Sequence, residues 1–143
     1  MKIVILAVGR MRDAGLAAAC DEYLARARRH LPVETWEVKD GPALVNRIPS
    51  GSGAEVVALE PGGESWTSAA FARFLGDRML HGQTKALVFL IGGSDGLPPQ
   101  AVRRAAQRLS LSSLTLPHRL ARVVLCEQIY RATSVLRGEP YNR

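Results

Sequence analysis

The chain has few cysteines and few histidines. Only two of its 143 residues are cysteine, Cys20 and Cys126, and they are far apart in sequence and in no C-x-x-C pair. This pattern indicates neither a disulfide framework nor a cysteine zinc site, and it favours a reducing, cytoplasmic compartment. The three histidines have no partner histidine at helical spacing and no adjacent cysteine. We therefore predict no metal site.

Long hydrophobic runs are also missing. The two longest, residues 3–8 and 86–91, have six residues each, whereas a helix that crosses a membrane needs about 20. We therefore predict no membrane association. With 47% apolar residues, a chain of this length can bury a core of its own, and we expect residues 1–143 to form a single domain.

Lysine is scarce, but arginine is abundant. Lysine stands at three positions against 16 arginines, and the formal net charge is +6. A guanidinium group binds phosphate oxygens in pairs and stacks on bases, so this excess suits a nucleic-acid partner. A GC-rich genome, which replaces lysine codons by arginine codons, would produce the same composition. The charge alone leaves both interpretations open.

Strand and helix patterns alternate along the chain. Residues 2–8 are apolar on both faces, which predicts a buried central strand. Further strands are expected at 33–38, near a sheet edge, and at 54–59, 85–91 and 109–116, with a turn at 60–63. Helices are expected at 14–29, 43–47, 67–79, 99–108 and 118–137, with Asp13 as the cap of the first and Thr67 or Ser68 as the cap of the third. This order predicts an α/β fold, a sheet of mostly parallel strands with helices on both faces.

Parallel sheets bind ligands outside the carboxyl ends of their strands, and three loops fall there. They are residues 60–64, 92–96 and 112–118. Residues 92–96 also match G-x-S-x-G, but Pro98 and Pro99 delay the following helix, so we reject a serine-hydrolase site. Neither a dinucleotide fingerprint nor a phosphate-binding P-loop is present.

Helical periodicity predicts which side chains are buried. In the helix that begins at residue 67 these are Phe71, Phe74 or Leu75, and Leu80. In the last helix the expected core face is Ala121, Val124, Leu125, Ile129, Ala132, Val135 and Leu136, and the opposite face, with Arg122, Cys126 and Ser134, is mixed. Leu120 and Val123 on that mixed face suit a subunit interface.

Two polar features of the last helix have open interpretations. Glu127 and Arg131 stand four residues apart in the favourable order, which predicts at least a surface ion pair. His118 stands at the helix start beside the presumed ligand loops, and position alone allows a structural or a catalytic role.

Four strings of residues together resemble one known family. They are LIGGSDG at 90–96, LSLSSLTLPH at 109–118, EQIYRA at 127–132 and the ending PYNR at 140–143. The chain closely resembles the ribosomal RNA large subunit methyltransferase H family, small bacterial enzymes of the SPOUT class. Members methylate N3 of a pseudouridine in 23S rRNA with S-adenosylmethionine. Asn142 stands where the family usually has histidine.

The resemblance implies a fold and a site. It implies a SPOUT-type sheet with a C-terminal trefoil knot, a homodimer, and action on 23S rRNA. Because so small a domain has no separate RNA-binding module, we expect it to act on the assembled ribosome. The S-adenosylmethionine site would consist of Leu59, Gly93, Ser112, Ser113, Leu114, Thr115, Leu116 and Pro117. The catalytic residues would be His118, Glu127, Tyr141 and Arg143, with the tail completing the pocket of the partner subunit. Two alternatives stay open: a SPOUT methyltransferase that acts on tRNA, and a catalytically silent RNA-binding dimer.

Overall fold

The computed structural model describes residues 1–141 and contains one five-stranded sheet. The strands follow the spatial order β2-β1-β4-β3-β5, and all four pairings are parallel. Their bounds are Lys2–Val8 (β1), Val33–Val38 (β2), Ala54–Ser65 (β3), Ala86–Ile91 (β4) and Gln107–Ser110 (β5). The predicted parallel α/β sheet is confirmed, with the first strand inside it and the second at an edge.

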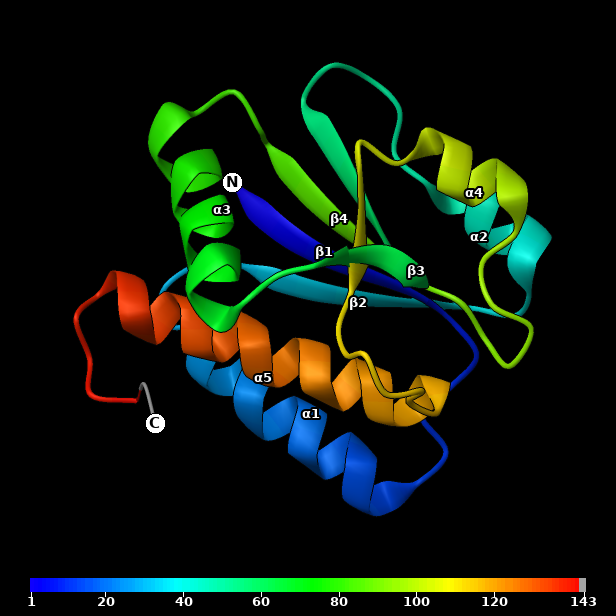
Figure 1. The fold of residues 1–143 in the computed structure, drawn as a ribbon, viewed down its shortest axis with the longest axis horizontal. Coiled ribbons are helices and arrows are strands. Elements are labelled where there is room, and N and C mark those ends of the chain that lie inside the picture. Colours follow the sequence, from blue (N-terminus) through cyan, green and yellow to red (C-terminus); the bar gives the residue numbers. More distant parts are fainter. Residues whose placement is uncertain (142–143) are drawn as a thin grey trace.

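Helices cover both faces of this sheet, as predicted. They are Ala14–Ala27 (α1), Gly41–Arg47 (α2), Ser68–His81 (α3), Pro99–Arg104 (α4) and His118–Leu136 (α5). Figure 1 shows α1, α3 and α5 on one side of the sheet and the two short helices, α2 and α4, on the other. None of the helices formed by residues 1–141 has the length and apolar character needed to cross a membrane.

The alternation of side chains along β1 produces the two layers. Ile3, Ile5 and Ala7 pack in the core beneath α1, α3 and α5, whereas Val4 and Leu6 pack in the core beneath α2 and α4. All five side chains are fully buried. Successive strand residues point to opposite faces, so a strand covered on both sides must be apolar throughout.

Capping side chains define where the helices begin. Asp13, predicted as a cap, accepts a hydrogen bond from the Leu16 N–H at 2.9 Å, and Thr67 accepts one from the Ala70 N–H at 3.0 Å. Asp40 does the same for α2. Each oxygen satisfies an N–H that has no partner inside its helix.

The predicted turn at residues 60–63 is wrong, because β3 continues through it to Ser65. Leu59 and Glu64 both pair with Leu109, so the residues between them form an irregular excursion from the ladder. A Cβ at Gly63 would lie 2.8 Å from the backbone of Arg108 and Leu109. The glycines here permit two strands to approach closely, a role that composition does not distinguish from a turn.

The chain between α4 and α5 also differs from the prediction. Helix α4 ends at Arg104 rather than 108, and β5 comprises Gln107–Ser110 rather than 109–116. The Ala106 N–H donates to the Val56 carbonyl at 2.8 Å, so pairing with β3 begins before the leucine–serine alternation does. From Leu111 onward the chain leaves the sheet.

Two predictions about buried helix faces are wrong. Leu80 is 80% exposed, because at 3.6 residues per turn it lies about 180° from Phe71. In α5, Arg122, Cys126 and Ser134 are buried although we placed them on the mixed face, and Leu136 is 43% exposed. Helix α5 packs against α1, α3 and the sheet core together, so its buried stripe is wider than one arc and is rotated toward α1.

Candidate functional site

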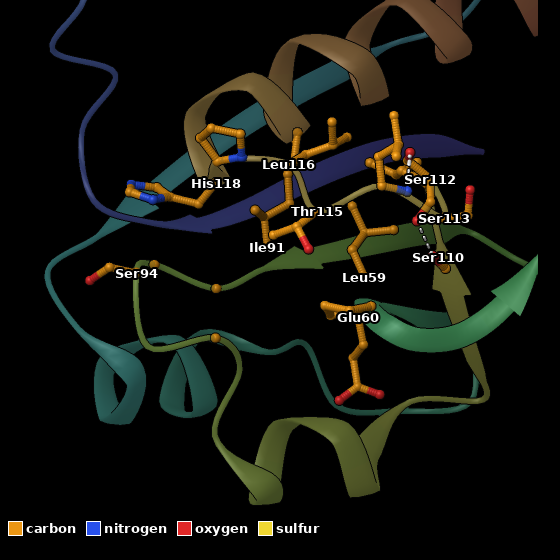
Figure 2. A pocket seen from close by; sticks show the side chains of 18 residues that line it. Leu59, Glu60, Ile91, Ser94, Ser110, Ser112, Ser113, Thr115, Leu116 and His118 are labelled. Carbon is orange, nitrogen blue, oxygen red and sulfur yellow. Dashed lines mark hydrogen bonds between the residues drawn. The ribbon is translucent and has the colours of Figure 1, made fainter.

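A cavity of about 480 Å³ lies at the carboxyl ends of β4 and β5, beside residues 59–61 of β3. All three loops expected to gather there contribute to its lining. Figure 2 shows Leu59, Ile91, Thr115 and Leu116 gathered at its centre, while the Glu60 carboxylate points away from them. The volume falls within the range of roughly 300–1,000 Å³ typical of small-molecule sites. The three segments that the sequence predicts to come together therefore line one cavity.

All eight residues that the resemblance assigns to the cofactor line this one cavity. They come from β3, from the loop after β4 and from the segment between β5 and α5. Sequence reasoning did not place four further lining residues at the site, which are Ile91, Ser110, Leu111 and Ala121. Ile91 and Ser110 end their strands, so the rule of carboxyl ends could have identified them.

The segment from Ser112 to Leu116 offers unused hydrogen-bond donors. Ser110 Oγ donates to the Ser112 carbonyl at 2.9 Å, and the Leu114 N–H donates to Ser112 Oγ at 2.9 Å. Within residues 1–141, no other backbone N–H of this segment donates to a partner in the chain. Leu114 is 76% exposed and adds apolar surface. Free N–H groups beside apolar side chains suit a ligand with a flat heteroaromatic ring and polar edges.

The glycine-rich loop after β4 is tightly folded. The Gly96 N–H donates to the Gly93 carbonyl at 3.0 Å, and Gly96 has φ +76°. A Cβ at Gly92 would lie 2.3 Å from the Gly96 carbonyl carbon. Only a residue without a side chain fits at Gly92, so this position fixes the shape of one cavity wall.

His118 is the one titratable candidate that the structure places in the cavity. It is the first residue of α5, directly after Pro117, and it is half-buried in the lining. In Figure 2 its imidazole lies at the end of the cavity where Ser94 stands. Its two ring nitrogens can donate or accept a proton at that position.

Glu127 and Tyr141 lie elsewhere, in a cluster farther along α5. Nine residues of helix separate Glu127 from His118, which corresponds to about 13 Å. Arg131 Nη2 contacts Glu127 Oε2 at 2.8 Å, and the Tyr141 hydroxyl donates to the same oxygen at 3.2 Å. The Tyr141 ring also packs on Tyr130, with centroids 4.5 Å apart. Arg143, the other tail candidate, lies outside the described residues.

The expected Glu127–Arg131 surface pair is present, but it is not on the open surface. Both side chains are 18% exposed, and the backbone carbonyl of Tyr141 accepts a further hydrogen bond from Arg131 at 3.2 Å. The ion pair therefore anchors residue 141 against the helix of its own chain. No side chain of this cluster lines the cavity.

Tyr141 is harder to ionise than an ordinary tyrosine. Burial and the negative charge of Glu127 raise its pKa from 10.0 to about 12. Between these values the unfolded chain has released the proton and the folded chain retains it. The contribution of this group to the free energy of unfolding is therefore present below pH 10 and is lost as the pH rises toward 12.

A titration tests this directly. The difference in phenolate ultraviolet absorbance between the parent chain and Tyr141→Phe should have its midpoint near pH 12, because Tyr141 is the only phenol removed. We also expect the unfolding free energy of the parent to fall more steeply than that of Tyr141→Phe above pH 10. A difference midpoint near 10 would contradict the described packing.

Two other kinds of site were considered, a thiolate nucleophile at Cys126 and a metal centre. A hydrogen bond with Cys20 and burial raise the pKa of the Cys126 thiol, which opposes formation of a thiolate nucleophile. Among residues 1–141 no three histidine, cysteine or carboxylate side chains stand close enough together to hold a metal ion.

The chain matches a known family over nearly its full length. Residues 1–142 match a family model described as "Predicted SPOUT methyltransferase". A crystal structure of a probable rRNA-methyltransferase from Porphyromonas gingivalis shares the fold with a TM-score of 0.56 at 12% identity, over 95% of this chain and 70% of that one. A probable methylase family protein from Haemophilus influenzae gives 0.56 at 11% identity, over 99% and 70%. The fold and the matched family define a SPOUT methyltransferase.

Curated relatives identify the family more narrowly. Two proteins named Ribosomal RNA large subunit methyltransferase H are similar to this chain. The one from Sorangium cellulosum is 50% identical, with 99% of each chain covered. The one from Anaeromyxobacter dehalogenans is 45% identical, with both chains fully covered. The chain belongs to the ribosomal RNA large subunit methyltransferase H family of SPOUT methyltransferases.

Proposed function

We propose that this protein transfers the methyl group of S-adenosylmethionine to N3 of a pseudouridine in 23S rRNA, in the assembled ribosome. The observation that carries the proposal is the convergence of all eight expected cofactor residues on one cavity. The names of relatives that match the chain over its full length support rRNA as the substrate. An excess of arginine suits the same substrate.

The lining fits the proposed cofactor. Free backbone N–H groups between Ser112 and Leu116 can bind the edge of an adenine ring, and Leu59, Ile91 and Leu116 can enclose its faces. When bound, S-adenosylmethionine supplies an electrophilic methyl group on a sulfonium. Transfer to nitrogen needs no metal, so the protein has chiefly to position the nucleophile and accept its proton.

His118 is the residue of this chain best placed for proton handling. The N3–H of a pseudouridine is an imide, which becomes nucleophilic only as its proton leaves. His118 lines the cavity, and a neutral imidazole nitrogen there can accept that proton or orient the base while another group accepts it. In our proposal Arg143 stabilises the negative charge that develops on the imide oxygens.

We further propose that residues 1–143 act as one domain in a homodimer. Glu127 is about 13 Å along α5 from His118, and Tyr141 is hydrogen-bonded to it. In our proposal both residues therefore act at the cavity of the partner subunit, together with the tail. Leu120, which is 39% exposed on α5, would pack in the interface. The trefoil knot implied by the resemblance stays a prediction.

A methyl-acceptor assay tests the function. The purified chain is incubated with S-adenosylmethionine carrying a labelled methyl group and with intact ribosomes, free 23S rRNA or tRNA. We expect label in 23S rRNA of intact ribosomes, and mass mapping should place one added methyl on a pseudouridine. Label in tRNA would favour the tRNA alternative. Absence of S-adenosylmethionine binding would favour the silent RNA-binding dimer.

A further inference from the structure

Four basic residues in the loops after β1 and β2 and at the start of α5 form no ion pair with the described side chains. Several arginines on or next to the helices have a carboxylate partner; these are Arg26, Arg78, Arg122, Arg131 and Arg137. By contrast, Arg10, Arg12, Lys39 and Arg119 form no ion pair with any side chain among residues 1–141. The first three are exposed, and all four follow β1 or β2 or stand in the first turn of α5.

Two contacts connect the loop with Arg10 and Arg12 to the cavity lining and to α5. At its start, Val8 lies against Gly93 of the cavity lining, 3.2 Å from where a Cβ of that glycine would be. At Gly9, the carbonyl accepts a hydrogen bond from Arg122 Nη2 at 2.8 Å. Arg122 stands one helical turn after His118, so the loop and the first turn of α5 are adjacent.

Arg122 and Glu37 connect three parts of the chain at this point. Arg122 is only 3% exposed, and its guanidinium forms an ion pair with Glu37 of β2. The same carboxylate oxygen accepts the Met11 N–H at 3.0 Å. Helix α5, strand β2 and loop 9–12 are thereby joined through one buried charge. Burial of a guanidinium is costly without such partners, so this arrangement gives the exposed loop a defined conformation.

The acidic side chains at this edge form no ion pair with Arg10 or Arg12. Asp13 and Asp40 each accept a backbone N–H as helix caps, and Glu37 is used by Arg122 and Met11. Asp95, exposed in the glycine-rich loop, forms no ion pair with a side chain among residues 1–141. Arg119 has a buried Nε that lacks a partner among the same residues.

We propose that Arg10, Arg12 and Arg119 bind RNA phosphates that flank the target nucleotide, and that Arg122 and Glu37 position loop 9–12 for this contact. The proposal rests on the proposed function and assigns its RNA-binding surface. An arginine binds phosphate through two parallel N–H donors. A loop held in one conformation loses less entropy on binding than a free one. Phosphate contacts fix the register of the RNA, which brings one base to the cavity.

The test compares two charge-reversed double variants. Arg10→Glu with Arg12→Glu changes the proposed surface. Arg73→Glu with Arg103→Glu changes the net charge by the same amount on exposed positions of α3 and α4. Each protein is assayed for affinity to a single-stranded homopolymeric RNA and to intact ribosomes over a range of salt. Further measurements are S-adenosylmethionine affinity by calorimetry, and KM and kcat for ribosomes.

For Arg10→Glu with Arg12→Glu we expect RNA affinity to fall roughly tenfold or more and KM for ribosomes to rise, with S-adenosylmethionine affinity unchanged. The slope of log affinity against log salt should decrease by about 0.7–0.9 for each phosphate that the protein no longer neutralises. An equal loss in the Arg73→Glu, Arg103→Glu control, or no loss in the first variant, would overturn the proposal. A parent chain that binds RNA through this loop but methylates no rRNA would refute the proposed function alone.

The positioning role of Arg122 is tested by a measurement that a loss of stability alone would not change, the salt dependence of RNA binding. Arg122→Met should raise KM more than it lowers kcat and should reduce the salt slope, because the loop no longer presents its two arginines. Arg122→Lys, which can still donate to Glu37, should recover part of both effects. An Arg122→Met protein that is destabilised but keeps the parent salt slope would overturn the positioning role.

Discussion

Gly92→Ala is expected to weaken S-adenosylmethionine binding roughly tenfold or more, a loss of about 1.4 kcal/mol in binding free energy. The added Cβ would lie 2.3 Å from the Gly96 carbonyl carbon and 2.6 Å from the Leu97 nitrogen. Both atoms belong to the backbone, so relief requires the whole loop to move rather than one side chain to rotate. Because this loop forms a wall of the cavity, its displacement changes the shape of the site.

A second glycine provides the control. Gly82, at the end of α3, has φ +69° and open space around its Cβ position. Gly82→Ala should therefore cost about 1 kcal/mol of stability through backbone strain and leave cofactor affinity unchanged. Calorimetric titration and thermal unfolding of both variants distinguish the two effects. Equal cofactor affinity in Gly92→Ala and the parent would show that the loop does not shape the binding site.

Removal of residues 141–143 is expected to abolish methyl transfer while the protein still folds, dimerises and binds the cofactor. In our proposal the tail contributes a charge-stabilising group to the partner's cavity, and loss of such a group reduces kcat by about 100-fold or more. Within its own chain Tyr141 donates a hydrogen bond to Glu127, accepts one from Arg131 and packs on Tyr130. Their loss should lower stability by only about 1–2 kcal/mol.

Mixed dimers show which subunit uses the tail. The truncated chain has an intact cavity, and Gly92→Ala retains an intact tail, so a heterodimer of the two contains one complete site if tails act on the partner. Random mixing in equal amounts should then restore about a quarter of the parent activity at a cofactor concentration that leaves Gly92→Ala unsaturated. No restoration would mean that the tail serves its own subunit. Parent-level activity of the truncated chain alone would exclude any role for the tail.

Local sequence patterns determined much of the fold. The apolar run at 2–8 could only be a strand covered on both faces, and Asp13 and Thr67 marked helix starts because their oxygens cap free N–H groups. The alternation of strands and helices implied parallel pairing, and parallel pairing gathers the loops at one edge. The location of the cavity followed from that rule alone.

Local sequence patterns gave wrong predictions where an element contacts several other segments at once. Arg122 was placed on the mixed face of α5 by its helical angle, yet it is buried. Glu37 and the Gly9 carbonyl, from other segments, bind two of its guanidinium nitrogens. Residues 60–63 have the composition of a turn but form an excursion within β3, because Gly63 permits contact with the Arg108 and Leu109 backbone.

The sequence by itself determined the layers, the central strand and the three segments that line the cavity, because each depends on residues close together in the chain. Only the tertiary structure decided that Glu127 and Tyr141 lie away from their own cavity and that Arg122 fixes loop 9–12. Such contacts join segments that are distant in sequence, and their existence depends on how the elements pack. A sequence pattern does not describe how distant segments pack. In the folded chain a buried charge requires hydrogen-bond partners, and this requirement favours the observed contacts.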